Sequence, residues 1–322
     1  MAVEFRRGGV ANGFLEPLYR AARAQSGDPL AWAAGERLAE VAAKGERTMI
    51  ITGHVHPVAL PVGETDGPPG AVALARALVL GWDVPVTLLC EPSVVEPLRD
   101  TCTAAGLVIR DAQSLPLPRS VALEPFPTDA ADARHRAAAL AANAGALVAV
   151  EKIGPCADGA YRTASGTDVS ADLAKADLLV EAVRDRGGLT IGIGDVGNEL
   201  GMGAIADTVA DVLARGEQIA CTTRTDALVI AGCSNWGAYA IAAVLAMLKG
   251  DAELVHSPAL ERAMIEACCR AGAVDGFSAA PTLEVDGASW EFHAAFVRML
   301  GDLVALALDS RPAMRHRFGT TT

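Results

Sequence analysis

The sequence has few aromatic residues and no long apolar run. Phenylalanine, tryptophan and tyrosine make up 4% of its 322 residues, whereas hydrophobic residues of all kinds make up 51%. Most of that share is alanine, valine and leucine, a composition that suits helices packed on both faces of a parallel sheet. Because no stretch approaches the roughly 20 apolar residues that a membrane-spanning helix needs, the sequence predicts no membrane partner.

Basic clusters and a secretory signal are also missing. No run of Lys or Arg is longer than a pair and the formal net charge is −12, so the chain would repel a nucleic-acid backbone and an anionic membrane surface alike. The first thirty residues carry Glu4, Arg6, Arg7, Arg20 and Arg23 in place of the apolar core of a signal peptide. We therefore expect a cytoplasmic protein that does not bind nucleic acid.

The seven cysteines have neither a CxxC pair nor the spacing of a metal finger, and their number is odd. Free cysteine is commonly a small buried hydrophobic residue. Reduced thiols without a catalytic role are predicted at Cys90, Cys102, Cys156, Cys221, Cys233, Cys268 and Cys269.

Short β-rich runs alternate with helical segments along the chain. Residues 1–47 carry apolar positions at helical spacing and are predicted to be an N-terminal helical cap, with an α/β domain over residues 48–322. This alternation predicts a mostly parallel, Rossmann-like sheet in three layers. Strands are expected at 49–53, 84–90, 107–110, 146–150, 189–193 and 227–231, and helices at 71–80, 93–105, 129–143, 171–186, 238–249, 259–271 and 290–307.

Two further segments contain turn residues or prolines. Residues 115–118 alternate Leu with Pro, which cannot donate to a strand ladder, so an edge or connecting segment is expected there. Residues 273–288 are expected to form turns. The very apolar helix at 238–248 is expected in the core, and a subunit interface in a homo-oligomer is the alternative.

Four predicted loops are dense in glycine and polar side chains. They are residues 53–70, 151–170, 194–203 and 232–237, and each follows a predicted strand. In an open parallel sheet the ligand lies beyond the carboxyl ends of the strands. We therefore expect the four loops to meet there and to form the site.

The first loop contains Glu64, Thr65 and Asp66 directly before a helix start. Exposed backbone N–H groups and the helix dipole favour an anion at such a position, for example a substrate carboxylate. Glu64, Thr65, Gly67 and Gly70 are accordingly candidate substrate-binding residues, and Asp66 is a candidate catalytic acid or base. Ordinary helix capping is the alternative for Thr65.

The third loop places Asp195, Asn198 and Glu199 among closely spaced glycines. Residues 192–197 formally match GxGxxG, but no acidic residue ends a second strand about 20 residues on, so no nucleotide cofactor is expected. Asp195 and Glu199 are candidate ligands of a divalent cation such as Mg²⁺ or Mn²⁺, or act directly as acid and base. Asn198 is a candidate substrate contact, with helix capping as its alternative.

The second loop begins with Glu151 at the end of an apolar strand. Partial desolvation would raise its pKa and suit a general base, although the adjacent Lys152 could neutralise it. Asp158 and Tyr161 lie in the long polar stretch that follows and are candidate substrate-binding residues, because long loops in compact folds are commonly functional.

The fourth loop offers Ser234, Asn235 and Trp236 as candidate substrate-binding residues. Its sequence lacks the GxSxG pattern, so an α/β-hydrolase is not predicted. His54 and His56 flank the first loop, but no third ligand matches them in the sequence, and metal binding by them is not expected.

Four stretches together resemble the C-terminal domain of the D-glutamate cyclase family. They are TDGPPGA at 65–71, EKIGPCADGAYR at 151–162, TIGIGDVGNELGMG at 190–203 and VIAGCSNWGAYAIAAVL at 229–245. The resemblance runs from about residue 48 to residue 287 and includes the order and spacing of the motifs. It implies a hydro-lyase that converts D-glutamate, or a related small amino acid, to 5-oxo-D-proline by loss of water.

A mechanism can be assigned to the candidate residues on this hypothesis. Glu151 or Asp66 would accept the ammonium proton, and Asp195 with Glu199 would hold the cation that polarises the γ-carboxyl group. Backbone amides of the first and third loops, with the fourth loop, would bind the α-carboxylate. Two alternatives remain open: a hydratase, dehydratase or isomerase of another small carboxylic acid, and a non-catalytic amino-acid-binding domain.

Overall fold

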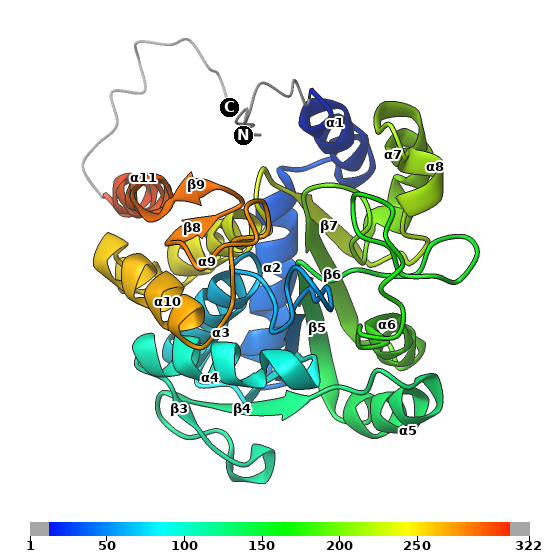
Figure 1. Ribbon diagram of the computed structural model, residues 1–322. Helices are drawn as coiled ribbons and strands as arrows, with labels where there is room; N and C mark the ends of the chain where they lie inside the picture. The colour runs from blue at the N-terminus through cyan, green and yellow to red at the C-terminus, as the bar shows by residue number, and fades with distance from the viewer. Residues whose placement is uncertain (1–12, 310–322) are drawn as a thin grey trace.

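The computed structural model of the chain describes residues 13–309, which form a seven-stranded sheet between layers of helices (Figure 1). The strand order is β3-β4-β2-β1-β5-β6-β7, and all neighbouring strands in this sheet are parallel. The predicted fold class is therefore confirmed. The strands are β1 (Arg47–Thr52), β2 (Val86–Cys90), β3 (Val108–Ile109), β4 (Ser120–Pro125), β5 (Ala144–Val150), β6 (Leu189–Gly194) and β7 (Ala227–Ile230).

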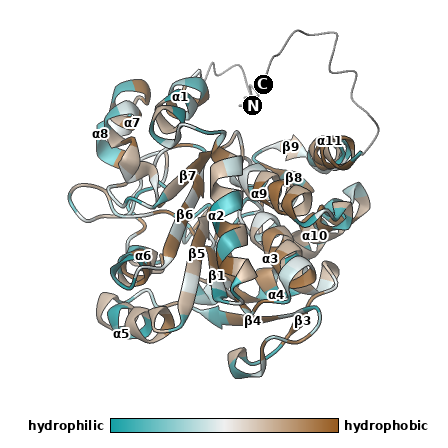
Figure 2. Cartoon of the chain, turned by 180° about the vertical axis from the view of Figure 1, so that it is seen from behind, coloured by the Kyte–Doolittle hydropathy of each residue, from teal (hydrophilic) through white to brown (hydrophobic). Residues whose placement is uncertain are grey.

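The central strands are apolar on both faces because helices cover both sides of the sheet (Figure 2). Helices α2, α3, α4 and α9 cover one face, and α5 and α6 pack together on the other. The helices are α1 (Leu15–Ser26), α2 (Leu30–Ala43), α3 (Pro68–Trp82), α4 (Val95–Ala104), α5 (Ala130–Ala141), α6 (Ala176–Asp185), α7 (Ala206–Val212), α8 (Gly216–Ile219), α9 (Ser234–Lys249), α10 (Pro258–Arg270) and α11 (Trp290–Leu308).

Helix α9 lies in the core, as expected from its composition. It packs against α2, α3 and α11, and most of its side chains are buried. Helices α10 and α11 pack on each other outside α4 and α9, and a short antiparallel hairpin, β8 (Glu284–Val285) with β9 (Ala288–Ser289), precedes α11. No helix within residues 13–309 has the length and apolar character needed to cross a membrane.

The segment predicted as an N-terminal cap contains α1 and α2, and its first twelve residues lie outside the described range. Leu15 and Leu18 of α1 are buried, and α1 packs beside the edge strand β7. Helix α2 contacts β1, β5, β6 and α9 directly. The two helices thus contribute to the same helical layer as α3 and α9.

Among the elements that differ from the expectation, three do so for reasons that their contacts show. β4 was not predicted because Ser120–Pro125 includes Ser, Glu and Pro, yet it is stabilised by pairing with both β2 and β3. Helix α6 begins at residue 176 instead of 171, because backbone N–H groups just before it bind Glu91 and the carbonyl of Pro127. Helix α9 begins four residues earlier than predicted, because a distant side chain caps it.

The sheet has its topological switch point between β1 and β5. From β1 the chain moves outward through β2 to β3 and β4, and it then returns beside β1 to build β5, β6 and β7 in the opposite direction. The loops that follow β1 and β5 therefore leave the sheet in different directions at its carboxyl edge, where open α/β sheets bind their ligands.

Candidate functional site

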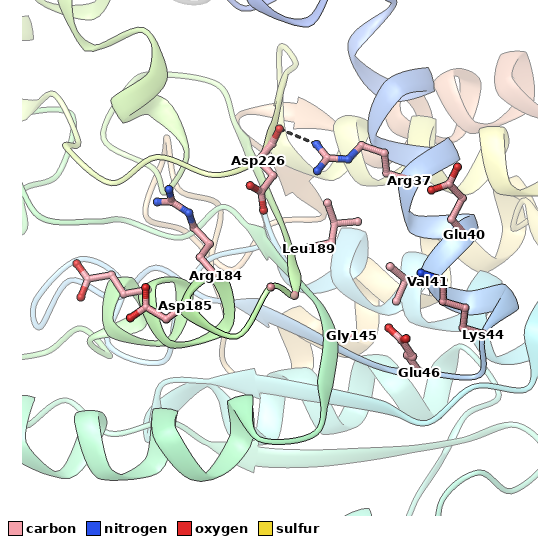
Figure 3. Close-up of a pocket in the computed structure, with 13 residues that line it drawn as sticks. Arg37, Glu40, Val41, Lys44, Glu46, Gly145, Arg184, Asp185, Leu189 and Asp226 are labelled. Carbon is pink, nitrogen blue, oxygen red and sulfur yellow. Dashed lines mark hydrogen bonds between the residues drawn. The ribbon is translucent and has the colours of Figure 1, made fainter.

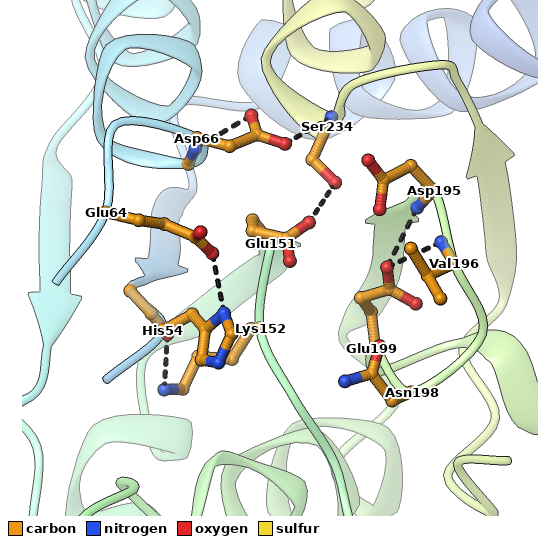
Figure 4. Close-up of polar contacts among 12 residues, drawn as sticks. His54, Glu64, Asp66, Glu151, Lys152, Asp195, Val196, Asn198, Glu199 and Ser234 are labelled. Atoms are coloured by element: carbon orange, nitrogen blue, oxygen red, sulfur yellow. Dashed lines mark hydrogen bonds and ion pairs between the residues drawn. The ribbon is translucent and has the colours of Figure 1, made fainter. Parts of the chain in front are cut away.

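Side chains from all four glycine-rich loops meet beyond the carboxyl ends of the central strands (Figure 4). Glu64 and Asp66 come from the loop after β1, Glu151 follows β5, Asp195 follows β6, and Ser234 begins α9. The loops touch directly: Ser234 Oγ donates to Glu151 Oε2 at 2.6 Å, and Ser234 N donates to Asp66 Oδ2 at 2.8 Å. Carboxylates therefore gather at the switch point.

Asp66 and Asn235 cap each other's helices. Asp66 Oδ2 and Oδ1 accept from the backbone N–H groups of Ser234 and Asn235, both at 2.8 Å, so Asp66 caps α9. Asn235 Oδ1 in turn accepts from Gly67 N at 2.9 Å and Gly70 N at 2.7 Å at the start of α3. The amino ends of the two helices are thereby locked together.

Gly67 and Gly70 permit this contact. A Cβ atom at Gly70 would lie 2.7 Å from Asn235 Oδ1, and Gly67 has a φ of +105°, which residues with a side chain rarely adopt. Their amides, which were predicted to hold a substrate carboxylate, instead bind Asn235. Both glycines therefore allow the backbone of the loop to approach Asn235 closely.

The Glu199 carboxylate binds backbone amides of its own loop, the third loop. Its Oε1 accepts from Asp195 N at 2.9 Å and Val196 N at 2.8 Å, and its Oε2 accepts from Gly197 N at 2.6 Å. The amides of this loop are thus bound to Glu199 and are not presented to a substrate carboxylate. Asn198 Nδ2 donates to Arg162 O at 2.8 Å and ties the third loop to the second.

Glu151 is a buried residue in an unusual backbone conformation. Its φ is +45°, in the left-handed region that non-glycine residues seldom adopt. Such conformations cost about 1–3 kcal/mol and cluster at functional sites. The turn directs the Glu151 carboxylate toward Ser234 and Asp195 (Figure 4).

Three carboxylates form one compact group, which we call the acid triad: Asp66, Glu151 and Asp195. One oxygen from each lies within 4.8 Å of the others. Burial, and then the charge of Glu64, raise the pKa of Asp66 to about 6, although hydrogen bonds from Asn235 and Ser234 oppose the shift. Burial and neighbouring carboxylates also raise the pKa of Glu151 and of Asp195 well above their usual values.

This geometry makes a fully ionised acid triad unfavourable. Two like unit charges about 4–5 Å apart repel by roughly 3–4 kcal/mol at an effective dielectric constant of about 20. The triad must therefore hold protons or be neutralised by a cation. Its all-oxygen composition suits a hard divalent cation such as Mg²⁺ or Mn²⁺.

His54 lies beside the acid triad, although metal binding by it was not expected from the sequence. Its Nδ1 is 2.6 Å from Glu64 Oε1, and His54, Glu64 and Glu151 form a second group whose ligand atoms lie within 4.8 Å of one another. The third member of this group, Glu151, thus comes from a loop distant in sequence. His56 instead accepts hydrogen bonds from Val58 N and Ala59 N in its own turn.

Lys152 does not neutralise Glu151. Its buried ammonium group instead contacts Glu91 at the end of β2 and donates to Gly53 O at 2.8 Å. The Lys152 carbonyl accepts from Leu200 N at 2.8 Å. Lys152 therefore connects the loops after β1, β2 and β6 and leaves the acid triad without a neutralising lysine.

Three predicted substrate contacts have partners of their own. Asp158 is exposed and pairs with Arg162 at 2.6 Å, and the hydroxyl of Tyr161 donates to Asp177 on α6. Trp236 Nε1 donates to His293 at 2.9 Å, and the ring stacks on Phe296 with centroids 4.5 Å apart. These contacts connect Tyr161 to α6 and Trp236 to α11.

Sequence reasoning missed Asp286 and the part played by Cys233. Asp66, Cys233 and Asp286 form a third group of ligand atoms within 4.8 Å. The Cys233 thiol donates to Asp66 Oδ1 at 3.3 Å, and burial raises its pKa well above the usual value, so it is not a thiolate nucleophile at neutral pH. In the sequence, Asp286-Gly287 signals only a turn.

A second, charged groove lies at the opposite edge of the sheet, near the amino ends of the strands (Figure 3). It has a volume of about 620 Å³ and mixes Arg, Lys, Asp and Glu side chains. Arg37 spans part of it and donates to Asp226 O at 2.8 Å. Because this edge lacks the acid triad and is not where open α/β sheets bind ligands, we place the candidate site at the carboxyl edge.

Comparison with known proteins identifies the family. The family described as D-glutamate cyclase-like, C-terminal, matches residues 18–301. The chain belongs to this family. Human mitochondrial D-glutamate cyclase is 34% identical to this D-glutamate cyclase-like chain over 212 residues, which cover 63% of this chain and 33% of the human protein. The chain thus spans about a third of the length of that relative.

The family match includes every element that builds the site. Residues 18–301 contain the four loops, the acid triad and the β8–β9 hairpin. They also begin within α1, so the helices before β1 belong largely to the matched region. The D-glutamate cyclase-like region is therefore the part of the chain that carries the candidate site.

The mutual capping of α3 and α9 predicts a large cost for Asn235→Ala. The substitution would leave Gly70 N and Thr65 O without their partner and would remove one of the two acceptors of Gly67 N, which also donates to Asp66 Oδ1; each unsatisfied buried group costs about 1–3 kcal/mol. Urea denaturation should show a loss of unfolding free energy of at least about 2 kcal/mol. Asn143→Ala, at an exposed position, is the matched control; equal stability of the two variants would contradict the assignment.

The acid triad predicts that the metal-free protein loses stability as the pH rises. Because the folded-state pKa values are raised, the associated stability is complete below about pH 4, the unfolded value, and falls as the pH passes about 6 for Asp66 and higher for the others. With a chelator present, the melting temperature should drop between pH 5 and pH 8. Asp195→Asn should flatten this dependence, and an unchanged slope would argue against the coupling.

Proposed function

We propose that the chain catalyses the dehydrative cyclisation of D-glutamate, or of a closely related amino acid, to 5-oxo-D-proline, as a hydro-lyase. The observation that carries this proposal is the acid triad at the switch point of a domain that belongs to the D-glutamate cyclase-like family. The name of the human relative supports D-glutamate as the substrate to test first.

Lactam formation makes two opposite demands on the site. The α-amine must lose a proton before its nitrogen can attack the γ-carboxyl carbon. The carboxylate under attack is a poor electrophile, and one of its oxygens must be protonated or otherwise neutralised before it leaves as water. A base and a source of positive charge must therefore act within a few ångströms of each other.

Glu151 fits the role of the base. Its raised pKa makes it a stronger base than an exposed carboxylate, and the hydrogen bond from Ser234 fixes one of its oxygens. The substrate nitrogen loses two protons in all, one before its attack and one after it, and both can be delivered within the acid triad to the departing oxygen, which then leaves as water. Asp66 and Asp195 are close enough to share such a proton.

The residues of the acid triad also fit a divalent cation, which we propose as a cofactor. A dicarboxylate substrate would be repelled by three uncompensated carboxylates, whereas a bound cation reverses the sign of the local charge. When bound, such an ion polarises a carboxyl group as a Lewis acid. Asp66 and Asp195 would hold it and leave Glu151 as the base; Glu199, predicted as a ligand with Asp195, is in no such ligand group among residues 13–309.

The test of the proposed function is an assay of D-glutamate turnover with Mn²⁺ or Mg²⁺, in which 5-oxoproline is detected by mass spectrometry. Wild type should form the product, and Asp195→Asn should lower kcat by about 100-fold or more, as expected on losing a catalytic acid or metal ligand. Asp207→Asn, at an exposed position on α7, is the control. Absence of product with wild type would contradict D-glutamate as the substrate. Near-normal turnover by Asp195→Asn would contradict the catalytic role of the acid triad.

A further inference from the structure

Lys152 and Glu91 form a buried ion pair that the proposed reaction does not use. Both side chains are fully buried, and the Lys152 ammonium group contacts the Glu91 carboxylate directly. Replacing a buried ion pair by apolar residues is often neutral for stability, so stability alone gives no reason for the pair. Among residues 13–309, Glu91 Oε2 also has no hydrogen-bond partner, which reduces what the pair can contribute. What distinguishes the pair is the set of segments that it joins.

The pair joins segments that follow three different strands. Lys152 follows β5, Glu91 follows β2, and the sheet order places β1 between these two strands. Lys152 Nζ donates to Gly53 O at 2.8 Å in the loop after β1. Glu91 Oε1 accepts from Ala174 N at 3.1 Å, just before α6. The Lys152 ammonium group thus reaches across the carboxyl end of β1.

Gly53 fits this contact because it has no side chain. Its φ is +113°, and a Cβ atom at this position would clash with Glu91 Oε2. The next residue is His54, whose Nδ1 lies 2.6 Å from Glu64 Oε1. Lys152 and Glu91 therefore hold the loop after β1 at the point where it enters the site.

Lys152 also adjoins the turn that directs Glu151. Glu151 has a φ of +45°, a conformation that persists only when the surrounding structure holds it. Backbone hydrogen bonds lie on both sides of the turn: Glu151 N donates to Ile193 O at 3.2 Å, and Lys152 O accepts from Leu200 N at 2.8 Å. The anchored side chain of Lys152 adds a third restraint directly after the turn.

The side chains of Glu151 and Lys152 point in opposite directions. In Figure 4 the Glu151 carboxylate points toward Ser234, whereas the Lys152 ammonium group lies away from it. The hydrogen bond from Ser234 holds one oxygen of the carboxylate and does not fix the backbone behind it. A relaxation of φ at Glu151 would turn the following residue and move the Lys152 ammonium group away from Gly53 O and Glu91. An unpaired charge in this buried region is unfavourable, so the ion pair opposes the relaxation.

We propose that Lys152, through its pairing with Glu91, is a positioning residue that keeps the Glu151 carboxylate in place for the substrate ammonium group. The inference rests on the proposed function, in which Glu151 is the base. A catalytic group misplaced by about 1 Å can slow a reaction by about 100-fold. A restraint on the backbone of Glu151 therefore affects turnover without contact between Lys152 and the substrate.

The test is the double variant Lys152→Met with Glu91→Gln, which leaves no unpaired buried charge and keeps an acceptor for Ala174 N. With D-glutamate and Mn²⁺, kcat should fall by about 10- to 100-fold while KM changes by less than about threefold, because only the base is displaced. The crystal structure of the variant should show a negative φ at Glu151 or the loss of its contact with Ser234. Lys152→Arg keeps a buried cation and should restore most of kcat.

Arg76→Met is the matched control, since Arg76 is a half-buried cation that also joins two segments through backbone carbonyls, those of Glu253 and Leu254. It should leave kcat unchanged. The inference is overturned by an unchanged kcat in the double variant, by a loss that lies mainly in KM, or by a Lys152→Arg variant as slow as the double variant. An unchanged position of Glu151 in the crystal structure overturns it as well.

A second double variant, Lys152→Gln with Glu91→Gln, replaces the first if the first does not fold, because two neutral amide side chains can hydrogen-bond to each other. The same results decide. If wild type forms no 5-oxoproline, the proposed function fails, and the crystal structure of the variant then tests the role of Lys152 separately. An unchanged φ at Glu151 together with an unchanged Ser234 contact would contradict that role.

Discussion

The mutual capping of two helices by Asp66 and Asn235 is the constraint on which the site depends. These residues are 169 positions apart in the sequence, yet each accepts the free backbone N–H groups at the start of the other's helix. Four backbone donors are bound in this way in a buried region, where an unsatisfied donor costs about 1–3 kcal/mol. The same contact fixes Ser234, which in turn fixes Glu151. The acid triad is therefore a consequence of how α3 and α9 meet.

The backbone amides and the carboxylates of the site consequently have roles different from those that the sequence around each residue suggests. Helix starts and glycine-rich loops commonly bind anions, but here Asp66, Asn235 and Glu199 occupy the amides themselves. Side-chain oxygens of the protein itself therefore take the place of an external anion at these amides. The polar groups that gather at the switch point are therefore mainly carboxylates, which favour cations over anions.

The sequence was sufficient to predict the parallel α/β fold, the four loops and their convergence, because apolar strands followed by glycine and polar residues indicate carboxyl-edge loops wherever they occur. It could not show which hydrogen-bond or ion-pair partner each side chain has in the folded protein. Asn235 looked like a substrate contact but caps α3, and Lys152 pairs with Glu91 across the sheet. His54 and Asp286 were missed because their neighbours in the site come from distant segments. Such pairings depend on tertiary packing, which local patterns do not encode.

The position of Lys152 determines the electrostatic character of the site. Had its ammonium group turned toward Glu151, the acid triad would have held an internal counter-charge, and a substrate would have met a less negative site. Its burial against Glu91 and Gly53 O instead uses that positive charge to join loops. The acid triad is then left to protons or to a bound cation for the offset of its charge. In the proposed function a divalent cation and the ammonium group of the amino acid would both supply positive charge there.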